Sequence, residues 1–377
     1  MTPENLFDAL HYADVRRPLP EASTLPSWCY TSAQFYRREL ERIFLKSWQF
    51  VGREDEIAQV GDYLSFDGQG GPLILIRGDD GNVRAFFNVC RHRGTQLLTG
   101  TGRAPKIVCP YHSWVYATDG SLERAPGMHD VRNFDVGTHA LAPVRLQTWA
   151  GFMFVCYAED GPELLDYLGT MPEFFSAYRP QELICVRRVE FHIQSNWKLL
   201  IENALEAYHT GSVHSSTLGH QQSKPVVSSA NWGGLFGYVD NDDSIAVLPG
   251  ALSALPHIAG LSGEQQRGTY FTNLYPCTQF VFAQDCMWWL SIQPDGPLRC
   301  RMVLGSCFPE STTRLEAFEP SLTAYYERWD RATPEDNAIA EAQQAGQQAG
   351  VVPAGRFSRE EFAVHALANW ILDQLID

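Results

Sequence analysis

The chain has 377 residues, of which 45% are hydrophobic and 12% aromatic, enough for more than one packed core. Its formal net charge of -15 excludes a general nucleic-acid binder, which needs a basic surface. No apolar run is long enough to span a membrane and the first residues lack a secretory signal, so we expect a cytoplasmic protein. The nine cysteines, an odd number, indicate reduced thiols rather than a disulfide framework.

The first half of the chain is predicted to be mainly β. A helix is predicted over residues 32–50, with Ser32 as its N-cap. Short β-rich runs separated by Gly, Asp and Pro follow between about 51 and 158, with an Asp-Gly hairpin signal at 80–81. This density of strands indicates a compact all-β domain.

The second half mixes helices with one antiparallel meander, predicted over residues 268–310. The helical patterns cover 162–178, 196–209, 321–332, 334–346 and 359–376. The predicted fold class is α+β, in which an all-β domain accompanies an antiparallel sheet surrounded by helices. The predicted boundaries are an N-terminal helical segment 1–45, the β domain 46–160 and the mixed domain 161–377.

Two short segments each combine one cysteine with one histidine: Cys90-x-His92 and Cys109-x2-His112. A structural zinc site usually takes its cysteines from one loop and its histidines from another. One cysteine and one histidine per loop suit a [2Fe–2S] centre in which one iron takes both thiolates and the other both imidazoles. The alternatives are a zinc site, or loop histidines beside buried thiols.

A second candidate metal site contains His209 and His214. On an unbroken helix these side chains would be rotated by about 140° from one another and could not face one metal. We predict that Thr210 and Gly211 interrupt the helix and swing His214 back. Two histidines and one carboxylate form the facial triad of non-haem Fe(II) oxygenases, although isolated histidine pairs are more often surface or core residues.

The segments "CRHRG…CPYHSW" and "NWKLLIENALEAYHTGSVH" resemble the C-x-H…C-x2-H and N-W-K…(D/E)-x2-H-x4-H signatures of Rieske non-haem iron oxygenase α subunits, the aromatic-ring-hydroxylating dioxygenase family. The resemblance extends from the helix near 32 to the helix after Pro334. It implies a Rieske [2Fe–2S] domain over 46–160 and a catalytic mononuclear non-haem iron domain over 161–377, on which segment 1–45 packs. It also implies the cluster ligands, with one iron on Cys90 and Cys109 and the other on His92 and His112.

The resemblance further implies that His209, His214 and Asp336 ligate a mononuclear Fe(II), with Glu335 as the alternative carboxylate. A different interpretation remains open for this region. The run that begins at Thr333 and Pro334 is also a good helix start, with Thr as N-cap and Pro at the first position.

Glu206 stands three residues before His209, where most family members carry Asp. A helix would place it about 60° from His209, on the same face. In the family this carboxylate bridges a Rieske histidine of the neighbouring subunit to a histidine on the iron. The alternatives are a solvated helix glutamate, or Glu202 one turn earlier as the bridge. Asn203 and Tyr208 are expected to support the ligands.

The implied activity is that of a terminal oxygenase, which hydroxylates a small aromatic or related substrate with O2 and electrons from NAD(P)H through a reductase, with or without a ferredoxin. The implied assembly is a head-to-tail homotrimer with electron transfer between subunits. Whether a β subunit is present stays open. The alternative substrate is a quaternary ammonium compound of choline, betaine or carnitine type, which would be hydroxylated or N-demethylated. Another class of function is a Rieske electron carrier without oxygenase activity.

The substrate pocket is expected to be lined by residues 202–260 and the meander, where aromatic side chains suit either an aromatic ring or a cation. An arginine in the pocket would favour an aromatic acid, and an aromatic cage beside an acid would favour the cation. The alternative is that these aromatics are sheet core. The candidates are Phe271, Phe280, Phe282, Trp288 and Trp289.

Overall fold

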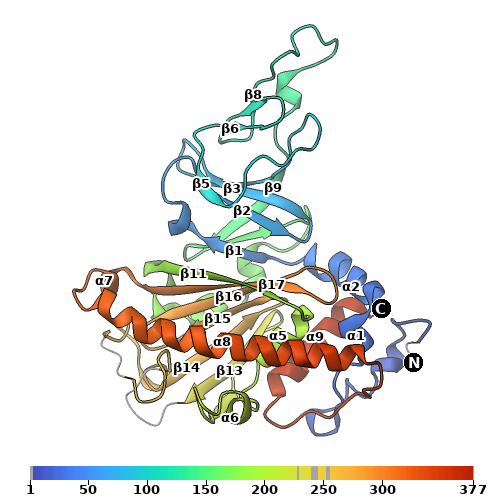
Figure 1. The fold of residues 1–377 in the computed structure, drawn as a ribbon, viewed down its shortest axis with the longest axis vertical. Coiled ribbons are helices and arrows are strands. Elements are labelled where there is room, and N and C mark those ends of the chain that lie inside the picture. Colours follow the sequence, from blue (N-terminus) through green and yellow to red (C-terminus); the bar gives the residue numbers. More distant parts are fainter. Residues whose placement is uncertain (1–2, 227–228, 239–244, 252–254, 377) are drawn as a thin grey trace. The chain divides into compact units, whose positions relative to one another are not determined.

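The computed structural model describes residues 3–226, 229–238, 245–251 and 255–376. It divides into two compact units (Figure 1), one formed by Phe44–Leu164 and the other by Met1–Ile43 together with Leu165–Asp377. The larger unit is therefore built from both ends of the sequence. The predicted α+β fold class is confirmed. None of the helices in the described ranges is long and apolar enough to cross a bilayer.

The smaller unit consists of β strands in two sheets. A seven-stranded antiparallel sheet has the order β1-β10-β9-β4-β3-β2-β5, and a three-stranded sheet has the order β6-β7-β8. The strands are β1 Gln49–Arg53, β2 Asp62–Gly68, β3 Gly71–Arg77, β4 Val83–Phe87, β5 Thr101–Arg103, β6 Ile107–Val108, β7 Val115–Tyr116, β8 Leu122–Arg124, β9 Pro143–Trp149 and β10 Phe152–Cys156.

Strand β3 separates two hydrophobic cores of this unit. Successive side chains on a strand point to opposite faces. Leu73 and Leu75 accordingly pack into one core, and Ile74 and Ile76 into the other. This double burial explains why the strand is apolar at four consecutive positions, 73–76, instead of alternating. The second core also contains Cys90 and Cys109, so both cysteines are set against packed side chains.

The larger unit contains a seven-stranded antiparallel sheet of order β11-β17-β16-β15-β14-β13-β12. The predicted meander forms its centre. Its strands are β11 Leu183–Ile193, β12 Ser223–Pro225, β13 Trp232–Tyr238, β14 Gly268–Leu274, β15 Thr278–Phe282, β16 Met287–Pro294 and β17 Cys300–Pro309. The α-helices are α1 Trp28–Thr31, α2 Ala33–Glu39, α3 Leu164–Leu168, α4 Met171–Phe174, α5 Trp197–Asn203, α6 Thr210–Val213, α7 Glu310–Thr313, α8 Phe318–Gln348 and α9 Phe362–Leu375.

The long helix α8 runs across this sheet (Figure 1) and covers part of its core. Its buried residues recur every three or four positions, the spacing of one helical face. They include Phe318, Leu322, Tyr325, Trp329 and Ala332. Asp336, the next position in this series, is thereby directed toward the interior of the unit.

Several predicted helices have other bounds in the structure. The helix predicted over 32–50 is α-helical only to Glu39 and continues as a π-helix over Leu40–Phe44, and residues from Gln49 onward instead pair with β10. Its predicted cap is confirmed, since Ser32 Oγ accepts hydrogen bonds from the Gln34 and Phe35 amides. The helices predicted over 321–332 and 334–346 form a single helix, with Pro334 inside it. Packing of the apolar face on both sides of Pro334 outweighs the local start signal, so Thr333 is not an N-cap.

Candidate metal centres

The two Cys/His loops of the smaller unit have the same backbone hydrogen bonds. The amide of Cys90 donates to Thr95 O over 2.8 Å, and that of Cys109 donates to Trp114 O over 2.8 Å. In each loop the residue four positions after the cysteine donates back to the cysteine carbonyl and has a positive φ, +75° for Gly94 and +56° for Ser113. Two matched turns thus present their cysteine and histidine in the same way.

The cysteines point inward and the histidines outward. Cys90 and Cys109 are only 3% and 2% exposed, whereas His92 is exposed and His112 half-buried. The Nδ1 atoms of the two imidazoles lie 3.2 Å apart. Trp114 stacks on His92 with ring centroids 4.9 Å apart and planes 9° apart. The donor set therefore has two soft thiols on the buried side and two imidazole nitrogens on the open side.

This donor set fits a Rieske cluster. Two nitrogen ligands on one metal, each at about 2.1 Å and about 90° apart, would be separated by about 3 Å. The Nδ1 separation of 3.2 Å agrees with that value. The hydroxyl of Tyr116 accepts a hydrogen bond from the Arg91 amide and lies 3.3 Å from Cys90 Sγ, so its own proton is available to a thiolate.

In the larger unit, a break between α5 and α6 positions the candidate iron ligands. Helix α5 ends at Asn203, and His209 is the residue before α6. The prediction that Thr210 and Gly211 interrupt the helix was wrong, because both lie inside α6 and the break comes earlier. Glu206 Oε2 accepts a hydrogen bond from the His209 amide over 3.0 Å and helps to fix this break. The helical 60° relation between Glu206 and His209 accordingly does not apply.

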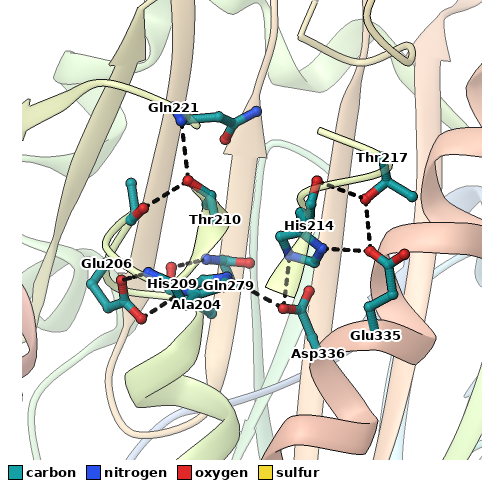
Figure 2. Close-up of polar contacts among 11 residues, drawn as sticks. Ala204, Glu206, His209, Thr210, His214, Thr217, Gln221, Gln279, Glu335 and Asp336 are labelled. Carbon is teal, nitrogen blue, oxygen red and sulfur yellow. Dashed lines mark hydrogen bonds and ion pairs between the residues drawn. The ribbon is translucent and has the colours of Figure 1, made fainter. Parts of the chain in front are cut away.

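Helix α8 brings two adjacent carboxylates to these histidines (Figure 2). Asp336 Oδ1 lies 3.0 Å from His214 Nε2 and 3.4 Å from His209 Nε2. Glu335 Oε2 instead accepts a hydrogen bond from His214 Nδ1 over 2.7 Å, and another from Thr217 Oγ1 over 2.7 Å. Asp336 therefore faces both Nε2 atoms, and Glu335 holds the far side of one ring.

Each histidine has its other nitrogen engaged by a carboxylate. Glu206 Oε1 lies 2.6 Å from His209 Nδ1, as Glu335 lies beside His214 Nδ1. When a metal is bound, such contacts keep the proton on Nδ1 and leave the Nε2 lone pair for the ion. Both Nε2 atoms face a carboxylate oxygen that is buried and accepts no hydrogen bond from the described residues.

A divalent cation between the three side chains would neutralise the Asp336 carboxylate and bind both Nε2 atoms. One ligand atom from each of His209, His214 and Asp336 lies within 4.8 Å of the other two, and no other set of three His, Cys, Asp or Glu side chains among the described residues is this compact. The edges of 3.0 and 3.4 Å match three adjacent ligands of one ion. His209, His214 and Asp336 would hold such an ion as a facial triad.

The charges of this cluster shift the pKa values of its histidines and of Asp336. Burial by itself lowers the pKa of His209, but the neighbouring carboxylates of Asp336 and Glu206 raise it to about 9. Burial likewise opposes ionisation of Asp336, yet the two imidazoles lower its pKa below the usual range. Without a metal the site therefore holds protons on its histidines, and a divalent cation would displace them.

A cavity of about 100 Å³ opens beside the triad and is large enough for several water molecules. Phe271 and Trp288 line it as predicted, whereas Phe280, Phe282 and Trp289 do not and are buried in the sheet core. Part of the expected lining, 227–228, 239–244 and 252–254, lies outside the described residues.

The other candidates occupy different positions. Asn203 lines the cavity, whereas Tyr208 is 59% exposed. Glu202 accepts a hydrogen bond from Tyr30 and does not contact either histidine. Arg328, which lines the cavity, was not considered from the sequence. The available signal was an arginine inside the apolar stripe of a helix.

Comparison with known proteins agrees with both units. Residues 181–376 match the model of the ring hydroxylating alpha subunit (catalytic domain), and residues 47–135 match the Rieske [2Fe-2S] domain. The chain belongs to the family of ring-hydroxylating α subunits, with a Rieske domain ahead of the catalytic domain. These domains imply a Rieske [2Fe–2S] cluster and a mononuclear iron.

Three proteins similar to this chain have names that include a quaternary ammonium substrate. The glycine betaine monooxygenase oxygenase subunit of Chromohalobacter salexigens is 38% identical over 207 residues, 55% of this chain. That match spans about half of the relative, 46% of its length. The chloroplastic choline monooxygenase of Spinacia oleracea is 28% identical over 99% of this chain and 83% of its own. A solved structure of the quaternary ammonium Rieske monooxygenase CntA with L-carnitine has a TM-score of 0.78 at 27% identity, over 94% of this chain and 96% of CntA.

Proposed function

We propose that this protein is the terminal oxygenase of a multicomponent Rieske system. The observation that carries this proposal is the triad of His209, His214 and Asp336, with both Nδ1 atoms engaged by carboxylates and both Nε2 atoms directed at one carboxylate oxygen. An electron carrier would need the cluster loops but not this second metal site.

In this proposal Cys90 and Cys109 bind one iron of the cluster, and His92 and His112 bind the other through Nδ1. His209 and His214 bind the mononuclear iron through Nε2. The third ligand is Asp336 rather than Glu335, because Glu335 already accepts hydrogen bonds from His214 Nδ1 and Thr217. When bound, the cluster supplies single electrons and the mononuclear Fe(II) activates O2 next to the substrate.

The residues of this chain orient the ligands and exclude water. Glu206 and Glu335 hold the two rings by their Nδ1 protons, which keeps each Nε2 lone pair aligned with the metal position. The apolar cavity wall limits solvent access to the open coordination positions. The chain therefore supplies geometry and protection for the reaction.

The proposed electron route and assembly are taken from the family. Glu206 is proposed to connect His209 with a Rieske histidine of a neighbouring subunit, in a head-to-tail homotrimer supplied by a reductase, with or without a ferredoxin. Inter-subunit electron transfer has been described for a quaternary ammonium Rieske monooxygenase of similar structure. The 2.6 Å contact of Glu206 with His209 supports the half of the bridge that lies within one chain.

The proposed substrate is a quaternary ammonium compound, which is hydroxylated or N-demethylated. The names of similar proteins favour this substrate over an aromatic hydrocarbon. The aromatic faces of Phe271 and Trp288 in the cavity are compatible with a trimethylammonium group. Hydroxylation of an aromatic acid remains the second candidate, because the same faces suit a flat ring and Arg328 supplies the arginine expected for such a substrate.

The test compares His209→Ala with His220→Ala, which removes an exposed histidine nearby. Iron content, visible absorption of the cluster and product formation coupled to O2 uptake are measured with a surrogate reductase. We expect about three irons per chain in the wild type and the control, and about two in His209→Ala, which keeps its colour and loses turnover. Normal turnover by His209→Ala would refute the proposal.

A further inference from the structure

Among the described residues that line the cavity beside the triad, Arg328 of α8 is the one arginine or lysine. The cavity wall is mostly apolar, with Leu290, Ile292, Met302 and Leu304 from the sheet and aromatic rings at Phe271 and Trp288. The acids in its lining, Glu206 and Asp336, are both engaged with the histidines of the iron site.

Arg328 is buried, with 5% exposure, and is held firmly on one side. Its Nε donates a hydrogen bond to Ile245 O over 2.6 Å, and its guanidinium carbon lies 4.9 Å from the centroid of the Trp288 ring. Neither Nη atom makes a hydrogen bond or an ion pair with a described residue. Burial lowers the pKa of Arg328 to about 10, so the group is still charged at neutral pH.

A buried cation that has no hydrogen-bonded anion among the described residues is costly, and proteins seldom retain one without a role. The free edge of a guanidinium offers N–H donors in a fork that matches the two oxygens of a carboxylate. A carboxylate on a bound molecule would satisfy the free donors of the Arg328 guanidinium.

The position of Arg328 on the helix suits a substrate that spans the cavity. Arg328 and Asp336 are eight residues apart on α8, about 12 Å along the helix axis. A molecule held by its acid group at Arg328 would therefore extend its other end toward the iron site. The aromatic rings would contact the segment between the two ends.

We propose that Arg328 is a specificity-determining residue that binds the carboxylate of the substrate. This inference rests on the proposed function, because it takes the triad as the place of reaction. The shared chemistry is a small carboxylate, carried either by a trimethylammonium compound such as L-carnitine or glycine betaine, or by an aromatic acid. Choline, which has the ammonium group but no carboxylate, should bind more weakly.

The test is calorimetric titration of the holoprotein with L-carnitine, glycine betaine, choline and benzoate. The proteins are the wild type, Arg328→Gln, Arg328→Lys and the control Arg331→Gln, which alters an exposed arginine of the same helix. We expect Arg328→Gln to weaken binding of the preferred carboxylate about 10- to 100-fold, Arg328→Lys to weaken it less, and the control to change nothing.

A ligand-side control does not depend on how the variants fold. The methyl ester of the preferred acid should bind the wild type about 10- to 100-fold more weakly, and Arg328→Gln should cause no further loss with the ester. Additive losses would show that the two groups do not interact, and would overturn the inference.

The four ligands test separately whether Arg328 binds a carboxylate and whether the substrate is a quaternary ammonium compound. Arg328-dependent binding of a trimethylammonium carboxylate supports both. Arg328-dependent binding of benzoate alone supports the role of Arg328 and refutes the ammonium substrate. Choline binding at least as tight as that of the acids, with no response to Arg328→Gln, overturns the inference and leaves the ammonium substrate in place. Failure of every carboxylate to bind also overturns it.

Discussion

Glu335→Gln tests whether Glu335 orients His214 or ligates the metal itself. The substitution keeps the shape of the side chain and removes its charge. It thereby weakens the 2.7 Å hydrogen bond that His214 Nδ1 donates to the carboxylate. Hydrogen bonds to charged groups contribute about 1.5–3 kcal/mol, and loss of such support weakens metal binding about 10- to 100-fold.

Two further variants should lose more and less metal affinity, respectively, than Glu335→Gln. Asp336→Asn replaces the oxygen that faces both Nε2 atoms, so it should cost more affinity than Glu335→Gln. Thr217→Val removes one of the two hydrogen-bond donors to Glu335 Oε2 and leaves the histidine contact, so we expect a loss below about 10-fold.

The assay is competition between the protein and a chelator for Fe(II) or Co(II), with the visible absorption of the cluster as an internal control. Glu327→Gln is the matched variant, since Glu327 is an exposed glutamate of the same helix that pairs with Arg331. Two results would refute the reasoning: a Glu335→Gln affinity equal to that of Glu327→Gln, or one lower than that of Asp336→Asn. The second would make Glu335 the ligand.

The remaining predictions concern two other glutamates. Glu206→Gln should still bind both metals when Fe(II) is supplied at saturating concentration, but it should slow the single-turnover rate of product formation, because a neutral amide holds His209 Nδ1 less strongly. An unchanged rate would count against the bridge. Burial raises the pKa of Glu202 from 4.5 to about 7, so the folded state favours the protonated carboxyl. The free energy of unfolding should therefore fall by up to about 3 kcal/mol as the pH rises from 4.5 through 7. Glu202→Gln should accordingly melt like the wild type near pH 4.5 and at a higher temperature near pH 8, and a difference independent of pH would contradict the shift.

The family of this protein and the motifs of its two candidate metal sites could be read from the sequence. Cysteine and histidine spacings are local properties, and short loops such as Cys90–Thr95 and Cys109–Trp114 close on themselves through their own backbone. The meander was also predictable, because alternation and turn residues are encoded within each hairpin. Glu335 and Asp336 could be placed near the iron only by resemblance to the family.

Tertiary structure decided the rest, because it depends on contacts between residues far apart in the chain. Local signals favoured a helix start at Thr333, but the packing of α8 on the sheet carries the helix through Pro334 and so brings Asp336 to face both Nε2 atoms. Glu335 and Asp336 have different roles because Glu335 reaches Nδ1 of His214 and Asp336 reaches Nε2. Both residues are about 120 positions from His214 in the sequence, so only the tertiary fold decides which nitrogen each one meets. Arg328 likewise became a candidate binding residue only when the sheet and the helix enclosed it, since burial is what makes an unpaired charge informative.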